Sequence, residues 1–76
     1  IIDGRYSFYD FLAYFDKEDL FDDDINFNTI SGLIIDILEE IPQEGQKVRW
    51  RDFTFEIMDM DAARIDKVLV HKVKED

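Results

Sequence analysis

A single stripe of aliphatic residues constrains this chain more than any other feature. Six apolar positions recur at the 3.6-residue period of a helix: Ile30, Leu33, Ile34, Ile37, Leu38 and Ile41. Asn28 or Thr29 can cap the start of this helix. Pro42 ends it, because proline excludes the α conformation at the residue before it. The pattern predicts an amphipathic helix over residues 30–41 with one face buried against another element.

Two positions within this helix require a neighbour. Gly32 lies in the first turn, where glycine costs up to about 1 kcal/mol relative to alanine. A close approach of another backbone explains a glycine there. Ile35 is apolar but lies off the buried stripe, so we expect another element to cover it. The first strand or a partner domain could supply that neighbour, and both residues are candidate interaction positions.

The C-terminal half alternates between apolar and polar residues as strands do. Pairing Trp50 with Phe53 and residue 48 with residue 55 places the aromatic side chains on one side of a hairpin. The same register sets Lys47 opposite Glu56 on the other side, and a one-residue slip would expose the aromatics. From residue 53 to residue 57 the residues expected to point inward have odd numbers, and directly after it they have even numbers, which predicts a bulge. The inward residues 65 and 68 are separated by three positions instead of an even number, which predicts a second irregularity.

The N-terminal half reads as a short strand, a turn and a helix. The first two residues form the strand, and Asp3-Gly4 closes it. Ser7 can cap a helix whose buried face is formed by Phe8, Phe11, Leu12 and Phe15. Residues 16–24 break the pattern and read as an acidic surface loop, pinned by Leu20 and Phe21, whereas the polar residues 72–76 should fray. The prediction is α+β, two helices packed on a mainly antiparallel sheet in the order β-α-α-β-β-β.

Composition limits the class of protein. The 76 residues carry a formal net charge of −10, which opposes binding to nucleic acid and to anionic membrane surfaces. There is no cysteine, so disulfides and thiolate metal sites are impossible. No apolar run approaches the roughly 18 residues of a membrane span, so we expect no direct membrane insertion by this segment. We expect residues 1–76 to form a single domain excised from a longer chain, since the sequence begins at Ile1 within a strand.

No group of residues predicts catalysis or a cofactor. His71 is the one histidine, and both serines read as helix-start residues, so a base and a nucleophile are not paired. Asp22, Asp24 and Asn26 match the first three ligand positions of an EF-hand. Phe27 stands where that loop needs glycine, and the closing glutamate is missing. A solvated acidic loop is the simpler interpretation, which leaves Asp22 and Asp24 as candidates for weak divalent-cation binding only.

Three basic residues on one strand are the best candidates for contact with an anionic partner: Lys47, Arg49 and Arg51. The alternative is a salt-bridged outer face of the sheet, because Asp52 and Glu56 lie close to them in the expected hairpin.

Several short motifs, in order along the chain, resemble a known family. They are Asp3-Gly4-Arg5, the run from Phe27 to Ile34, Ile41-Pro42-Gln43-Glu44-Gly45, Phe53-x-Phe55-Glu56-Ile57, and Asp61 with Arg64-Ile65-x-x-Val68-x-Val70. Together they resemble the signature of the CorC/HlyC transporter-associated domain over nearly the whole chain. The chain departs from that pattern in its more acidic 16–24 loop and in Arg51-Asp52, where an Asp-Gly type of turn is common.

The resemblance implies a fold related to a subdomain of certain FAD-binding proteins. It also implies an accessory domain at the C-terminus of bacterial magnesium/cobalt efflux and haemolysin-like membrane proteins, on the cytoplasmic side of the inner membrane. The implied partners are the CBS pair and membrane domain of the parent protein, or a second copy in a homodimer. The expected function is non-catalytic regulation by docking. The alternative is a small-ligand module that senses an adenine nucleotide, a flavin or a divalent cation.

Overall fold

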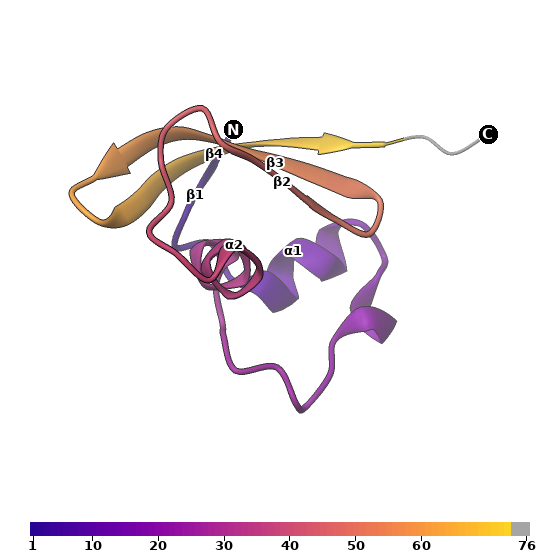
Figure 1. The fold of residues 1–76 in the computed structure, drawn as a ribbon. Helices are drawn as coiled ribbons and strands as arrows, with labels where there is room; N and C mark the ends of the chain where they lie inside the picture. Colours follow the sequence, from indigo (N-terminus) through magenta and orange to yellow (C-terminus); the bar gives the residue numbers. More distant parts are fainter. Residues whose placement is uncertain (74–76) are drawn as a thin grey trace.

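The chain folds into two layers, a four-stranded antiparallel sheet and two α-helices that cover one of its faces (Figure 1). The computed structural model describes residues 1–73. Its elements are β1 (Ile2–Asp3), α1 (Phe8–Tyr14), the short 3-10 helix η1 (Glu18–Leu20), α2 (Ile30–Leu38), β2 (Lys47–Trp50), β3 (Phe53–Asp61) and β4 (Arg64–Lys72). The strands lie in the order β1-β4-β3-β2. The predicted α+β class and element order are confirmed.

Helix α2 is shorter than the aliphatic stripe predicted. Thr29 caps its start, since its hydroxyl accepts a hydrogen bond from the Gly32 N–H at 3.0 Å. The helix ends at Leu38 because Glu39 adopts a left-handed conformation, with φ of 57°, and closes the last turn through its N–H. The prediction that the helix reaches Ile41 and is stopped by Pro42 was therefore wrong. Ile41, now beyond the helix, is 71% exposed.

Helix α1 begins where the sequence predicted, because the Ser7 hydroxyl accepts a hydrogen bond from the Asp10 N–H at 3.2 Å. Its aromatic face packs on the sheet: the rings of Phe11 and Phe53 lie 4.9 Å apart, edge to face. The core between the layers is formed by Phe8, Phe11, Leu12, Ile30, Leu33, Ile34, Val48, Phe53, Phe55, Ile57, Ile65 and Val68. Packing of aromatic rings on both layers thus fixes α1 against β3.

The hairpin register agrees with the sequence. Trp50 pairs with Phe53 and Lys47 with Glu56. Both predicted irregularities are present: the β3–β4 pairing shifts after Ile57 and again after Asp59. The pairing leaves one extra residue on each strand, Met58 on β3 and Asp66 on β4. Because two opposite bulges compensate each other, the strands regain their register at the hairpin tip.

The neighbour of Gly32 is not the backbone of another element. A Cβ at this position would lie 2.7 Å from the Cβ of Phe27, in the segment just before α2. The glycine is therefore explained by packing within the domain. Ile35, by contrast, stays 40% exposed on the outer side of α2.

The loop after α1 follows the expectation for residues 16–24. Leu20 packs against the core, and the ring of Phe21 lies 5.3 Å from that of Tyr9. At the other end of the chain, Lys72 belongs to β4 and the Val73 N–H donates to the Asp52 carbonyl, so the expectation of fraying is wrong for these two residues. The rest of that expectation, for residues 74–76, lies outside the described residues.

Gly4, in the turn after β1, is hydrogen-bonded to both β4 and α2. Its N–H donates to the Asp66 carbonyl of β4, and its own carbonyl accepts from the Ser31 N–H of α2, each at 2.8 Å. A Cβ on Gly4 would overlap the carbonyl oxygen of Ile65. Because that oxygen belongs to the backbone of a paired strand, it cannot move aside without disturbing the sheet.

We therefore predict that Gly4→Ala lowers the free energy of unfolding by more than about 2 kcal/mol, in the range of severe single substitutions. Gly45→Ala is the matched control. Gly45 has φ of +86°, and no atom lies within 4 Å of the place that an added methyl group would take, so only conformational strain of about 1 kcal/mol is expected. Urea unfolding of both variants measures the difference. Equal losses would contradict the role assigned to Gly4.

Candidate functional site

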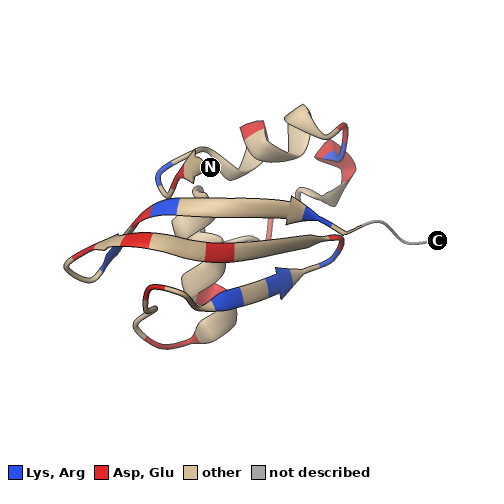
Figure 2. Ribbon diagram, turned by 90° about the horizontal axis from the view of Figure 1, so that it is seen from above, with Lys and Arg blue, Asp and Glu red and all other residues tan. Residues whose placement is uncertain are grey.

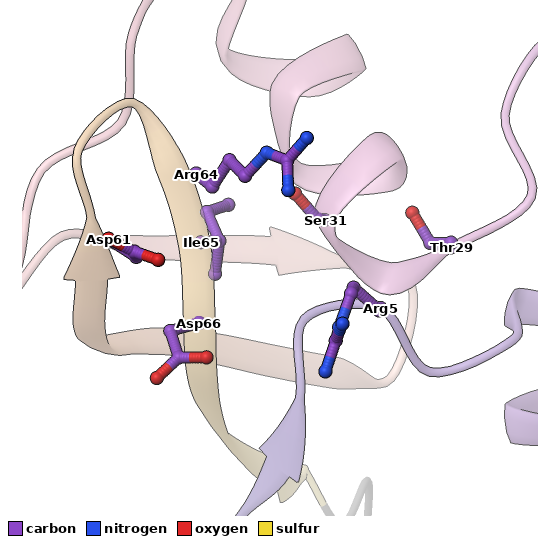
Figure 3. Close-up of a pocket in the computed structure, with 7 residues that line it drawn as sticks. All are labelled: Arg5, Thr29, Ser31, Asp61, Arg64, Ile65 and Asp66. Carbon is purple, nitrogen blue, oxygen red and sulfur yellow. The ribbon is translucent and has the colours of Figure 1, made fainter.

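A polar pocket lies where three elements meet: the turn after β1, the start of α2 and the tip of the β3–β4 hairpin (Figure 3). Its volume is about 390 Å³. It is lined by Arg5, Thr29, Ser31, Asp61, Arg64, Ile65 and Asp66. Side chains from residues far apart in the sequence thus face one polar hollow of mixed charge.

The backbone junction at Gly4 positions this pocket. It brings the turn that carries Arg5 against the first residues of α2 and against β4. Asp61 and Arg64 pair with each other at the end of the β3–β4 hairpin, so they enter from the opposite side. In Figure 3 the Arg64 side chain extends toward the start of α2, and Arg5 lies across the hollow from Asp61.

Arg5 is already engaged by the carboxylate of Asp3. That carboxylate accepts from the Arg5 backbone N–H at 2.8 Å and from its guanidinium at 3.3 Å. The side-chain hydrogen bond from Arg5 lowers the pKa of Asp3 below 3.8, and the same contact raises the pKa of Arg5. Both side chains are exposed, so solvent screens this pair and its contribution to stability is small.

Asp66, which lines the pocket, also has an ion-pair partner. Lys67 contacts the Asp66 carboxylate at 3.1 Å, and this hydrogen bond raises the pKa of Lys67. Arg64 has no ion-pair partner within 4.0 Å among the residues that the structure describes, although Asp61 and Asp66 line the same pocket. The Arg64 guanidinium is therefore the group in this pocket that could bind an added anion without breaking an existing ion pair.

The first three residues of α2 offer no free backbone N–H to a ligand in this pocket. The N–H groups of Ile30 and Ser31 donate to the carbonyls of Tyr6 and Gly4, at 3.0 and 2.8 Å. Those of Gly32 and Leu33 donate to the hydroxyl and carbonyl of Thr29, both at 3.0 Å. The N–H groups of the first three residues of α2 are therefore used, and the Leu33 N–H forms the first hydrogen bond within the helix. A phosphate could be held here by side chains only, which differs from the usual phosphate site at a helix start.

The groups that could carry out nucleophilic chemistry lie apart. Ser31 opens into the pocket from α2, on the helix-covered side of the sheet. His71 pairs with Thr54, is exposed, and alternates with Val70, whose side chain faces the helices. His71 therefore lies on the opposite face of the sheet and cannot accept a proton from Ser31.

The basic residues predicted as interaction positions gather along one edge of the sheet. Lys47 and Arg49 lie exposed on β2, the outermost strand (Figure 2). Arg51 follows in the turn, with its guanidinium 5.3 Å from the centre of the Trp50 ring. The Arg49 side chain donates to the Arg51 carbonyl at 3.2 Å. None of the three lines the polar pocket.

The two acidic candidates for a metal lie in the loop before α2. The Asp24 N–H donates to the Asp22 carboxylate at 3.0 Å, which closes a local turn. Within residues 1–73, no three His, Asp or Glu side chains are grouped so that they could hold a metal ion. The geometry of this loop thus gives the Asp22 carboxylate a structural use.

Sequence reasoning did not find the polar pocket. Arg5, Asp61 and Arg64 were noted as parts of family motifs, but the motifs are nearly sixty positions apart. Their meeting depends on the pairing of β1 with β4, which a two-residue strand does not reveal by any period. The glycine in Asp3-Gly4-Arg5 was the available signal, since its lack of a side chain permits that contact.

Comparison with known proteins identifies the family. The model of the CorC/HlyC transporter associated domain matches residues 1–74. The chain belongs to this family. A CorC_HlyC domain from Haemophilus ducreyi is 31% identical, with a TM-score of 0.83 over 97% of this chain and 87% of that one. The domain of a Xylella fastidiosa hemolysin, solved in complex with Mg²⁺ and Mn²⁺, is 29% identical, with a TM-score of 0.80 over 96% and 85%.

The curated relatives are much longer than this chain. A UPF0053 protein of Synechocystis is 36% identical over all of this chain but over only 17% of its own length. A polyamine export protein of Haemophilus influenzae is 38% identical over 84% of this chain and 13% of its own length. The matched region is thus a small part of each of these two longer proteins. No helix within residues 1–73 is long and apolar enough to cross a membrane.

We predict that Arg5→Gln raises the pKa of Asp3 toward 3.8, the ordinary value, because the largest cause of its lowering is removed. The hydrogen bond from the backbone N–H of residue 5 and the weaker attraction of Lys67 remain, and both continue to lower this pKa. In the unaltered protein this contact adds stability above pH 3.8 that is lost as the pH falls through the lowered pKa. NMR titration of the Asp3 carboxyl carbon measures both values. Lys67→Gln is the control and should change this pKa much less; an unchanged Asp3 pKa in Arg5→Gln would refute the assignment.

Proposed function

We propose that this chain is a non-catalytic regulatory domain of a bacterial CorC/HlyC-like transport protein for divalent cations such as magnesium and cobalt. The observation that carries the proposal is the family match over residues 1–74. A related domain from Neisseria meningitidis, 25% identical with a TM-score of 0.82, is described as the associated region of a putative Mg²⁺ and Co²⁺ transporter. In this proposal the chain carries no transport path of its own.

The proposed partner is the CBS pair of the parent protein. A transporter associated domain from a CBS domain protein of Porphyromonas gingivalis is 29% identical and has a TM-score of 0.82 to this chain. We place the domain at the C-terminal end of the parent, on the cytoplasmic side of the bacterial inner membrane. There it would act by binding one conformation of the transporter better than another, which shifts the populations of the two.

The proposed docking surface joins α2 to the basic edge of the sheet. Ile35 is 40% exposed on α2, and α2 packs against β2, which carries Lys47 and Arg49. Ile35 lies on the outer side of α2, whereas Lys47 and Arg49 alternate with the buried Val48 and so face away from the helices, and the proposed surface therefore wraps around the β2 edge of the domain. It would suit a partner surface that presents apolar side chains bordered by carboxylates, because opposite charges would then guide the encounter.

A second candidate function is cation sensing. The Xylella domain was solved with Mg²⁺ and Mn²⁺, and several relatives are polyamine export proteins. The acidic charge of this chain would attract such cations, although salt screens that attraction. An adenine nucleotide or a flavin is a weaker choice of ligand, since the N–H groups of the first three residues of α2 are already hydrogen-bonded within the domain.

The docking proposal predicts that Ile35→Ser and Arg49→Glu each weaken binding to the isolated CBS pair of the parent by about tenfold. Both residues are exposed, so the variants should fold; their unfolding curves check this. Asp23→Asn, in the exposed loop before α2, is the control and should bind as the unaltered chain does. Isothermal titration calorimetry measures the affinities.

Isothermal titration calorimetry also distinguishes the two candidate functions, docking and cation sensing. Titration of the chain with MgCl₂, CoCl₂ and spermidine should show no saturable binding tighter than about millimolar if docking is the function. Saturable micromolar binding of one of these cations, with no binding to the CBS pair, would contradict the docking function and support cation sensing.

A further inference from the structure

The two edges of the sheet differ in how they are protected. β2, at one edge, carries exposed Lys47 and Arg49, and charged side chains discourage pairing with another strand. At the other edge, β1 pairs with only two residues of β4: Ile2 with Val68 and Asp3 with Lys67. The last part of β4, residues 69–72, has no strand beside it on that side within the described residues.

The hydrogen-bond pattern shows which groups of β4 are left unpaired. The Asp66 carbonyl points to β1, where it accepts from the Gly4 N–H. The Val73 N–H points the other way and donates to the Asp52 carbonyl, in the turn before β3. Since successive residues of a strand alternate between its two neighbours, Val70 and Lys72 direct their N–H and C=O groups away from β3. These groups form an open template for one more strand.

An apolar pocket lies beside this open edge. It has a volume of about 210 Å³ and is lined by Ile2, Tyr6, Phe11, Tyr14, Phe15 and Val70. Tyr14 is 78% exposed at its rim, although its ring packs edge to face against Phe15 at 4.9 Å. An open strand edge next to a pocket for a side chain is the arrangement by which proteins bind an added strand.

The direction of β1 indicates what fills this place. β1 runs antiparallel to β4 with Ile2 opposite Val68, so the residue before Ile1 would lie opposite Val70 if the strand continued backward. Ile2 lines the apolar pocket, and side chains alternate along a strand. The side chain of the residue directly before Ile1 would therefore point into that pocket.

We propose that the segment of the parent protein directly before Ile1 extends β1 along β4 as far as Lys72 and inserts an apolar side chain into this pocket. The inference rests on the proposed function in one respect, the position of this chain after other domains of a longer protein. It adds a fixed connection: the domain would be attached to the preceding domain by a sheet strand rather than by a flexible linker.

A second copy of the chain fits this edge less well. Two copies would each carry a net charge of −10 and repel each other. The edge offers four residues and one pocket of about 210 Å³, whereas a stable interface buries roughly 1,000 Å² or more. A segment of the same polypeptide needs far less area, because covalent connection gives it a high effective concentration.

Amide hydrogen exchange measured by NMR tests the proposal on four chains. They are the 76-residue chain, the same chain with about a dozen of its native preceding residues, and two chains with artificial extensions before Ile1. Thr-Val-Thr-Val places valine in the pocket and serves as the positive control. Val-Thr-Val-Thr has the same composition but places threonine there.

The proposal predicts that the native and Thr-Val-Thr-Val extensions slow exchange of the Val70 and Lys72 amides by at least about tenfold relative to the 76-residue chain. The Leu69 and His71 amides, which face β3, should change little. The Val-Thr-Val-Thr extension should protect Val70 and Lys72 less. The proposal is overturned if the native extension leaves these two amides as fast as in the 76-residue chain, or if both artificial registers protect them equally. No ion or CBS pair enters this experiment, so its result is independent of the docking test.

Discussion

The two backbone hydrogen bonds of Gly4 are the contact on which most of this structure depends. One joins β1 to β4 and the other joins the same turn to the start of α2. Because the residue has no side chain, the backbone of β4 can approach closely enough to form the first of them. The junction has three consequences: it occupies the Ser31 N–H at the start of α2, it places Arg5 in the polar pocket, and it sets the line along which β1 runs beside β4.

The features that followed from local patterns were predictable from the sequence. The period of Phe8, Phe11 and Leu12 gave α1, and the alternation around Trp50 and Phe53 gave the hairpin register. Both bulges were visible as breaks in that alternation. In each case the residues that determine the local structure lie within a few positions of one another. Burial of one face of the helix or hairpin is therefore enough to specify that element.

The features that depend on distant contacts, or on the conformation of one residue, were not predictable. The end of α2 follows from the left-handed conformation of Glu39, which nothing in a stripe of aliphatic residues indicates. The neighbour of Gly32 is Phe27, from a segment with no periodic signal. The polar pocket combines the first and last strands, and its charges appear scattered until β1 is paired with β4. The basic row at residues 47–51 was found from sequence because its members share one strand and turn.

In the proposed function, the surfaces of this domain contact other parts of the parent protein. Its cations include Arg5, which is paired, Lys47 and Arg49, which are exposed along an edge, and Arg64 in the polar pocket. Its exposed apolar side chains include Ile35 on α2 and Tyr14 at the rim of the pocket beside β4. A regulatory domain needs such surfaces, since it must distinguish two arrangements of its neighbours.

The central claim, that the domain works by docking through α2 and the β2 edge, is tested most directly by NMR of the isotope-labelled chain titrated with the CBS pair of its parent. The account predicts chemical-shift changes centred on Ile35 and Arg49, with the acidic loop around Asp23 unaffected. Changes centred on that acidic loop on addition of MgCl₂, and none anywhere on addition of the CBS pair, would contradict it.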